Sequence, residues 1–349
     1  MRIFNKKPFL IAEIGFKFYD VAKMEGISEF EAAKLMIKNA KKSGVDAVMF
    51  YSFKAENIIS RNTPDDINWL TNSFDFEFEF FKNFDKFGVE EFRQLDEYCN
   101  DLGIMLLLSP LDFESVDNLD ELTDICVISS SDLNNIPFIE YAASRNKSIL
   151  LLTGGSTMRE IKLAVKAIED ISASNIAILH SVLSYPTEYS DANLLMINDL
   201  KEQFPNYEIG YVDYTVPDVN MALLTAAYNY GADILIKPFT LDKTLNNHDY
   251  AMDGDDIAKF KSNVGFLSKI KGYSNKQPLI CESSAIKAYR KSIVAKRDIK
   301  KGEVISMEKL TFKSPAVGIS PTDVNNVLGK TASKDIAEDD VLDYEMLND

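Results

Sequence analysis

The stretch Ile176-Ala-Ile-Leu-His-Ser-Val-Leu-Ser-Tyr-Pro-Thr187 guides the interpretation of the rest of the chain. It opens with a short apolar run of the length of a buried strand, which ends on His180, one of only 2 histidines. A Tyr-Pro turn follows directly. Because barrel enzymes hold their reactive groups at the C-terminal ends of their strands, the stretch predicts a strand that ends on a functional histidine. An imidazole bonded to a backbone carbonyl in a packed strand end fits the same pattern.

Apolar runs that end on a polar or acidic residue recur along most of the chain, separated by helical patterns. The predicted strands are 8–14, 46–53, 104–109, 124–130, 148–153, 175–181, 207–213 and 232–237. A strand, a helix and a strand in this order indicate a right-handed crossover between parallel strands. The repeated pattern predicts a (β/α)8 TIM barrel. A doubly wound open sheet alternates in the same way, but no Gly-x-Gly-x-x-Gly follows the first strand.

The pattern changes towards the C-terminus. After a helical segment at 256–271, short β-like runs at 292–295 and 303–306 lie between charged turns. We therefore predict a second, small β-rich domain. The expected boundaries are 1–271 for the barrel, 272–284 for a linker and 285–349 for the small domain.

The composition restricts the classes of partner. The chain has 349 residues, is 46% hydrophobic and 26% charged, and carries a formal net charge of −16. This charge opposes binding to nucleic acid and to anionic membranes, so an anionic substrate needs local cations or backbone amides. No apolar run reaches the roughly 18 residues of a transmembrane helix, and the first residues lack a secretory signal, so we expect a cytoplasmic location. The 3 cysteines are widely spaced and are expected to be reduced.

Two features leave alternatives open. The segment 54–88 is rich in acidic and aromatic residues, which favours a surface excursion with its own aromatic packing over a binding lid. His248 lies in the polar run Asn-Asn-His-Asp, which favours a solvated side chain over a catalytic one.

Several motifs in order carry a family likeness. They include Ile-Ala-Glu-Ile-Gly at 11–15, Ser-Pro-Leu-Asp at 109–112, Ser-Asp-Leu-Asn-Asn-Ile-Pro at 131–137, Thr-Gly-Gly-Ser-Thr at 153–157, Leu-His-Ser at 179–181, Phe-Thr-Leu-Asp-Lys-Thr at 239–244 and Gly-Ile-Ser-Pro at 318–321. With these motifs the chain resembles the N-acetylneuraminate (sialic acid) synthase family, in which a TIM barrel is joined to a C-terminal antifreeze-like (SAF) domain.

The resemblance implies an activity. Such enzymes condense phosphoenolpyruvate with an acylated hexosamine, such as N-acetylmannosamine, to give a nonulosonic acid and phosphate. It also implies a divalent metal, Mn or Mg, and a homodimer that swaps its C-terminal domains. The implied site residues are the catalytic Glu13, Asp132 and Asp249, the substrate-binding Lys54, Ser109, Ser131, Thr153, Tyr185 and Asp213, and the metal ligand His180, with Tyr214 at the position of the second metal histidine.

The chain departs from the family pattern at many of these positions. Residues that replace family polar or charged groups are Lys17, Phe18, Met49, Tyr51, Val127, Leu152, Leu183, Tyr214, Ile236, Pro238 and Ser314. A lost charge-assisted hydrogen bond removes roughly 1.5–3 kcal/mol from the binding of a phosphoenolpyruvate-like anion. Since several replacements are apolar, we expect a barrel mouth that is drier than that of the family.

Three functions remain open at this point. The first is a divergent transferase that uses phosphoenolpyruvate and a sugar. The second is a catalytically inactive relative that serves as a partner subunit or a sugar-binding regulator. The third is a Schiff-base aldolase that uses Lys237 or Lys17, since a lysine in an apolar mouth has a lowered pKa.

Overall fold

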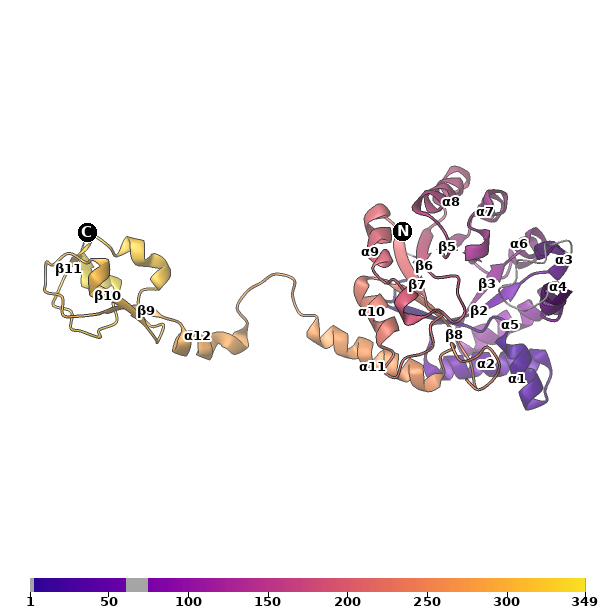
Figure 1. Cartoon of the computed structure of the whole chain (residues 1–349), viewed down its shortest axis with the longest axis horizontal. Coiled ribbons are helices and arrows are strands. Elements are labelled where there is room, and N and C mark those ends of the chain that lie inside the picture. The colour runs from indigo at the N-terminus through magenta and orange to yellow at the C-terminus, as the bar shows by residue number, and fades with distance from the viewer. Residues whose placement is uncertain (1–2, 61–74, 349) are drawn as a thin grey trace. The chain divides into compact units, whose positions relative to one another are not determined.

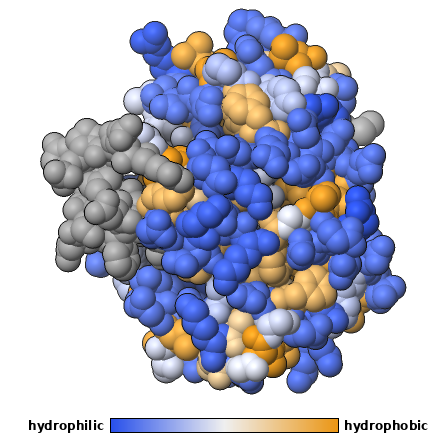
Figure 2. All heavy atoms as spheres, turned by 90° about the vertical axis from the view of Figure 1, so that its right-hand side faces the viewer, coloured by the Kyte–Doolittle hydropathy of each residue, from blue (hydrophilic) through white to orange (hydrophobic). Residues whose placement is uncertain are grey.

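The computed structural model describes residues 3–60 and 75–348. The chain divides into two compact units, Met1–Ile270 and Lys271–Asp349 (Figure 1). Within the described residues no helix has the length and apolar character that crossing a lipid bilayer requires. Figure 2 shows one face of the molecule, on which hydrophilic residues cover most of the surface and hydrophobic residues are scattered among them.

The first unit is a closed barrel of eight parallel strands in the order β1 to β8, which confirms the predicted TIM barrel. Its strands are β1 (Phe9–Glu13), β2 (Ala47–Ser52), β3 (Met105–Pro110), β4 (Ile125–Ile128), β5 (Ser148–Leu152), β6 (Ile176–His180), β7 (Glu208–Val212) and β8 (Ile234–Pro238). Pairing of β1 with β8, from Phe9 opposite Ile234 to Glu13 opposite Pro238, closes the barrel. These strands read as continuous apolar runs because both of their faces are buried.

Helices cover the outside of the barrel (Figure 1). They are α1 (Lys17–Glu25), α2 (Glu29–Ser43), α3 (Ala55–Ile58), α4 (Asp75–Lys82), α5 (Val89–Leu102), α6 (Phe113–Leu119), α7 (Ile136–Ala143), α8 (Met158–Ile171), α9 (Met196–Gln203), α10 (Ala222–Tyr230) and α11 (Gly254–Ile270), with 3-10 turns η1 (Ser130–Asp132) and η2 (Tyr189–Asp191). Helix α2 shows why these segments are helical. The Ser28 hydroxyl accepts a hydrogen bond from the Glu31 amide, Met36 and Ile37 are buried, and Gly44 ends the helix at φ 87°.

Successive strand residues face opposite sides of the barrel wall. One buried cluster fills the barrel and contains Ile11, Met49 and Val212, whereas a second cluster between strands and helices contains Ala12 and Tyr211. A residue at a strand end therefore reaches the barrel mouth only if it has the parity of the first cluster.

The second unit is small and β-rich, as predicted for a SAF domain. It contains α12 (Ser283–Tyr289), the antiparallel pair β9 (Ser292–Ala295) and β10 (Leu310–Lys313), the pair β11 (Thr331–Ala332) and β12 (Leu347–Asn348), and 3-10 turns η3 (Ile280–Glu282), η4 (Met307–Lys309), η5 (Pro321–Asn326) and η6 (Tyr344–Met346). It has its own buried core, which includes Ile293 and Ile336. The expected strand 303–306 is reduced to a single bridge between Val304 and Thr331.

Candidate functional site at the barrel mouth

A cavity of about 1050 Å³ opens at the C-terminal end of the barrel. Residues from the ends of β1 and β2 and from the segment after β7 form its floor. Its walls come from α1, from the β8–α11 loop and from the described part of the segment between β2 and α5. That segment supplies Phe81 and Phe84, whose rings also pack on Phe16, so it both packs its aromatic residues and lines the cavity.

Glu13 is the last residue of β1 and has the inward parity of Ile11. Its side chain is only 7% exposed, and the Tyr214 hydroxyl donates a hydrogen bond to its Oε2 at 3.2 Å. Burial raises the pKa of Glu13, although the Lys17 charge and hydrogen bonds from the Tyr51 and Tyr214 hydroxyls oppose the shift. Glu13 is thus a carboxyl group that holds a proton more readily than a solvated one does.

Tyrosines surround this carboxyl. The Tyr185 ring meets the Tyr214 ring edge to face at 4.6 Å, and the Tyr250 ring lies 6.4 Å from the first and 6.5 Å from the second. With Tyr51 these residues form what we call the tyrosine cluster. Burial raises the pKa of each of its hydroxyls, so all four remain hydrogen-bond donors at neutral pH.

Lys17, the first residue of α1, is a cation whose charge acts on this carboxyl. Its Nζ donates to the Asn247 carbonyl at 2.7 Å and lies 4.3 Å from the centre of the Tyr250 ring. Burial lowers the pKa of Lys17 to about 8, against the opposing charges of Glu13, Asp20 and Asp249. Below that pH the mouth therefore contains a partly desolvated positive charge next to a protonatable carboxyl.

The prediction that His248 is solvated is wrong. The residue is 1% exposed, its Nδ1 lies 2.7 Å from the Thr240 hydroxyl, and its Nε2 lies 3.6 Å from Oδ2 of Asp20. Both His248 and Asp20 line the cavity. The β8–α11 loop packs against α1 through these contacts, which local polarity could not indicate.

The structure does not bring His180 to the mouth. His180 has the outward parity of β6, stacks on Tyr211 at 5.5 Å, and its Nε2 donates to the Ala192 carbonyl at 2.9 Å. Burial lowers the pKa of His180, which the Ala192 contact opposes. Tyr214 faces the barrel interior instead, so the barrel wall separates the two expected metal ligands.

The donor groups of the described mouth do not fit a divalent metal. Within residues 3–60 and 75–348, no three His, Cys, Asp or Glu side chains converge to hold such an ion. The described groups that interact with Glu13 are the phenols of Tyr51 and Tyr214 and the amine of Lys17, which are poor ligands for a hard divalent cation at neutral pH.

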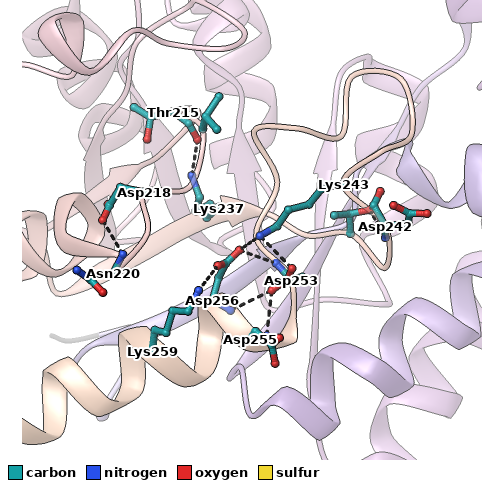
Figure 3. Close-up of polar contacts among 12 residues, drawn as sticks. Thr215, Asp218, Asn220, Lys237, Asp242, Lys243, Asp253, Asp255, Asp256 and Lys259 are labelled. Carbon is teal, nitrogen blue, oxygen red and sulfur yellow. Dashed lines mark hydrogen bonds and ion pairs between the residues drawn. The ribbon is translucent and has the colours of Figure 1, made fainter.

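Asp213 and Lys237 lie on the outer side of the barrel wall, away from the cavity. Nζ of Lys237 is 2.8 Å from Oδ2 of Asp213 and donates to the Thr215 carbonyl at 2.7 Å, a contact drawn in Figure 3. The two side chains are 0% and 2% exposed, and neither lines the cavity. Of the two lysines considered for an aldolase, only Lys17 lines it.

The remaining expected residues divide between the cavity and the surrounding structure. Ser131 and Tyr185 line the cavity. Hydrogen bonds tie the others to nearby groups: Ser109 donates to the Val127 carbonyl at 2.9 Å, Thr153 to the Leu179 carbonyl at 2.9 Å, Lys54 to the Asp85 carbonyl at 3.1 Å, and Asp132 accepts from Asn135 at 3.2 Å. Burial raises the pKa of Asp132. Asp249 is exposed, and its charge acts on Lys17.

Most of the apolar replacements do not line the cavity. Met49, Val127, Leu152 and Ile236 belong to the barrel core, and only Leu183 of the apolar replacements lines the cavity. The residues that sequence reasoning missed include Asp20 and Lys23, which follow Lys17 at intervals of three along α1. Their spacing of three residues places these polar side chains on one face of a helix, and this pattern could have indicated them in the sequence.

Comparison with known proteins gives a consistent result. Residues 36–276 match the NeuB family and residues 290–348 match the SAF domain. The chain is 35% identical to an uncharacterised protein of Methanocaldococcus jannaschii over 98% of this chain and 95% of the relative. It is 32% identical to the N,N'-diacetyllegionaminic acid synthase of Campylobacter jejuni over 97% and 99%. The crystal structure of an N-acetylneuraminic acid synthetase from Leptospira borgpetersenii, in complex with citrate, matches with a TM-score of 0.66 at 26% identity, over 81% of this chain and 91% of that one.

Proposed function

Because the chain belongs to the NeuB family, we propose that its barrel mouth condenses an acylated amino sugar with phosphoenolpyruvate to form a nonulosonic acid. One observation carries the proposal. Glu13, a carboxyl with a raised pKa, stands at the end of β1 among the tyrosine cluster, in a cavity of about 1050 Å³. Ligand sites of this kind combine apolar and aromatic walls with a few polar groups that orient the ligand.

The lining suits both substrates. The rings of the tyrosine cluster offer apolar faces for the carbon skeleton of a sugar, and their hydroxyls offer donors for its oxygens. Lys17 supplies a positive charge for an anionic group of phosphoenolpyruvate, and its partly desolvated position strengthens that attraction.

The proposed reaction requires one proton donor and one proton acceptor. The C3 carbon of phosphoenolpyruvate forms a bond to the aldehyde carbon of the open-chain sugar, whose oxygen takes a proton. Water then adds to C2 and loses a proton, and phosphate departs. Protonated Glu13 and the Tyr214 hydroxyl are the donors for the aldehyde oxygen, and the ionised Glu13 that results is the acceptor for the proton of water.

A second function keeps the sugar site without turnover, as a regulator or as the partner subunit of an active relative. Two other lysines that line the cavity are paired with carboxylates, which favours this function. Lys23 lies 3.5 Å from Asp20, and Lys86 lies 2.7 Å from Glu29. These carboxylates reduce the net positive charge that a triply ionised substrate needs. We also propose a homodimer with swapped C-terminal domains for either function, and light scattering on the full chain would test whether it is a dimer.

Product formation distinguishes the two functions. The purified chain is incubated with phosphoenolpyruvate and N-acetylmannosamine, its 6-phosphate or a diacetamido hexose, with manganese, magnesium or a chelator. Enzyme function gives phosphate and a nonulosonic acid in equal amounts by mass spectrometry, and the Glu13→Gln variant gives neither. Sugar binding by calorimetry without product would support the second function. Neither binding nor product would contradict both.

A further inference from the structure

Asp20 is a carboxylate on the cavity wall with incompletely used acceptors. It lies one turn after Lys17 on α1, lines the cavity, and its side chain is 36% exposed. The Lys23 ammonium is 3.5 Å from Oδ1, and His248 Nε2 is 3.6 Å from Oδ2. Both distances exceed the 2.7–3.2 Å of a well-formed hydrogen bond. Asp20, which lines the cavity, therefore keeps acceptor capacity for a ligand.

The imidazole behind Asp20 is held in place but incompletely bonded. Nδ1 of His248 lies 2.7 Å from the Thr240 hydroxyl, and Thr240 is itself bonded to the backbone of Asp242. Among the residues that the structure describes, Nε2 of His248 is buried and has no hydrogen-bond partner. A buried polar atom without a hydrogen-bond partner is unfavourable, so closing the gap to Asp20 is favourable. The Thr240–His248 pair is thus placed to fix the orientation of Asp20.

We propose that Asp20 is a ligand-binding residue that accepts hydrogen bonds from hydroxyl groups of the sugar, and that His248, supported by Thr240, is its positioning residue. This inference rests on the proposed function, because it requires that the cavity binds a sugar. A carboxylate is a strong acceptor for neutral donors such as sugar hydroxyls.

The surrounding charges define the class of sugar. Glu29 also lines this part of the cavity, and the lysines beside it and Asp20 are already paired with these two carboxylates. The two carboxylates offset the charges of Lys23 and Lys86, so a phosphate group here would gain little net electrostatic attraction, whereas an uncharged hydroxyl end does not depend on it. The site thus selects an unphosphorylated acylated amino sugar over a sugar phosphate.

The small number of histidines makes a direct test practical. With only 2 histidines, the imidazole signals in NMR spectra of the full-length protein reduce to His180 and His248, and the His180→Gln variant assigns them. N-acetylmannosamine is titrated into the protein and followed by NMR and calorimetry, in parallel with its 6-phosphate. We expect a shift of the His248 signal with N-acetylmannosamine, an unmoved His180 signal, and at least about tenfold weaker binding of the phosphate.

Variants complete the test. Asp20→Asn should weaken N-acetylmannosamine binding about tenfold or more and shift the His248 signal in the free protein. His248→Gln should weaken binding less, since its amide can still donate to Asp20. Glu25→Gln removes the same charge from the exposed side of α1 and should change neither readout. Sugar binding that leaves His248 unmoved and is insensitive to Asp20→Asn overturns this inference alone. No binding by either sugar overturns the proposed sugar site as well.

Discussion

The two sides of the barrel wall hold different kinds of polar group near the C-terminal ends of the strands. On the inner side, Glu13 and Tyr214 face a large cavity and keep polar atoms available to a ligand. On the outer side, His180 is bonded to a backbone carbonyl, and Lys237 to Asp213 and Thr215. Both sets lie at or just beyond strand ends, and strand parity alone separates them. The comparison shows that a strand-end position in a barrel does not by itself define an active-site residue.

The largest expected effect concerns stability on the outer side. Lys237→Met leaves Asp213 buried without its partner and should lower the free energy of unfolding of the barrel by about 3–5 kcal/mol. Urea unfolding followed by circular dichroism measures the loss. The double variant Lys237→Met, Asp213→Asn should recover part of it, because no unpaired charge remains. The exposed pair Lys166–Asp170 is the control, and Lys166→Met should change stability by less than about 1 kcal/mol.

On the inner side, the largest effect is expected on turnover. Glu13→Gln removes the proton-transfer group and should lower the rate of product formation about 100-fold or more.

The same substitution should raise the stability of the protein at neutral pH. Because burial raises the pKa of Glu13 above its ordinary 4.5, the wild-type protein should lose stability as pH rises above that value and Glu13 ionises. Urea unfolding between pH 4 and 8 should show a smaller loss in the variant. Equal pH dependence in both proteins would contradict a buried Glu13.

Lys17 should have a smaller, pH-dependent effect. Its pKa of about 8 means that its charge is lost as pH rises through 8, so phosphoenolpyruvate binding should weaken across this range. Lys17→Met should bind about tenfold more weakly at pH 7, and the difference should vanish near pH 10. Calorimetry at several pH values measures both constants. A constant ratio at all pH values would show that the Lys17 ammonium does not bind the anion.

The smallest expected effect compares two tyrosines of one chain segment, of which one faces the barrel interior and the other faces outwards. Tyr214→Phe removes one hydrogen bond to Glu13 and should raise its pKa further, which shifts the pH profile of turnover upwards and lowers the rate about fivefold. Tyr211→Phe changes the same residue type on the outer side of β7 and should leave the profile in place. A similar shift in both variants would contradict the separation of the two sides.

The sequence was sufficient to predict the barrel, but it was insufficient to predict which side chains face the barrel mouth. Strands such as Ile176–His180 are apolar on both faces, which made them recognisable as buried parallel strands. The same property hides which face is inward, so His180 and Tyr214 were assigned to one site although they point to opposite sides. His248 was misjudged for a different reason, since the polarity of its loop says nothing about the helix that packs over it.

Helix α1 has a consequence for how two ligands influence one another. Its nine residues include both the ammonium of Lys17 and the carboxylate of Asp20, one turn apart on a rigid rod. A ligand that draws Asp20 inwards therefore also moves Lys17. Thermodynamic reciprocity then requires that any factor by which the sugar tightens phosphoenolpyruvate is the factor by which phosphoenolpyruvate tightens the sugar. The short helix thus gives the two binding events one shared coupling factor.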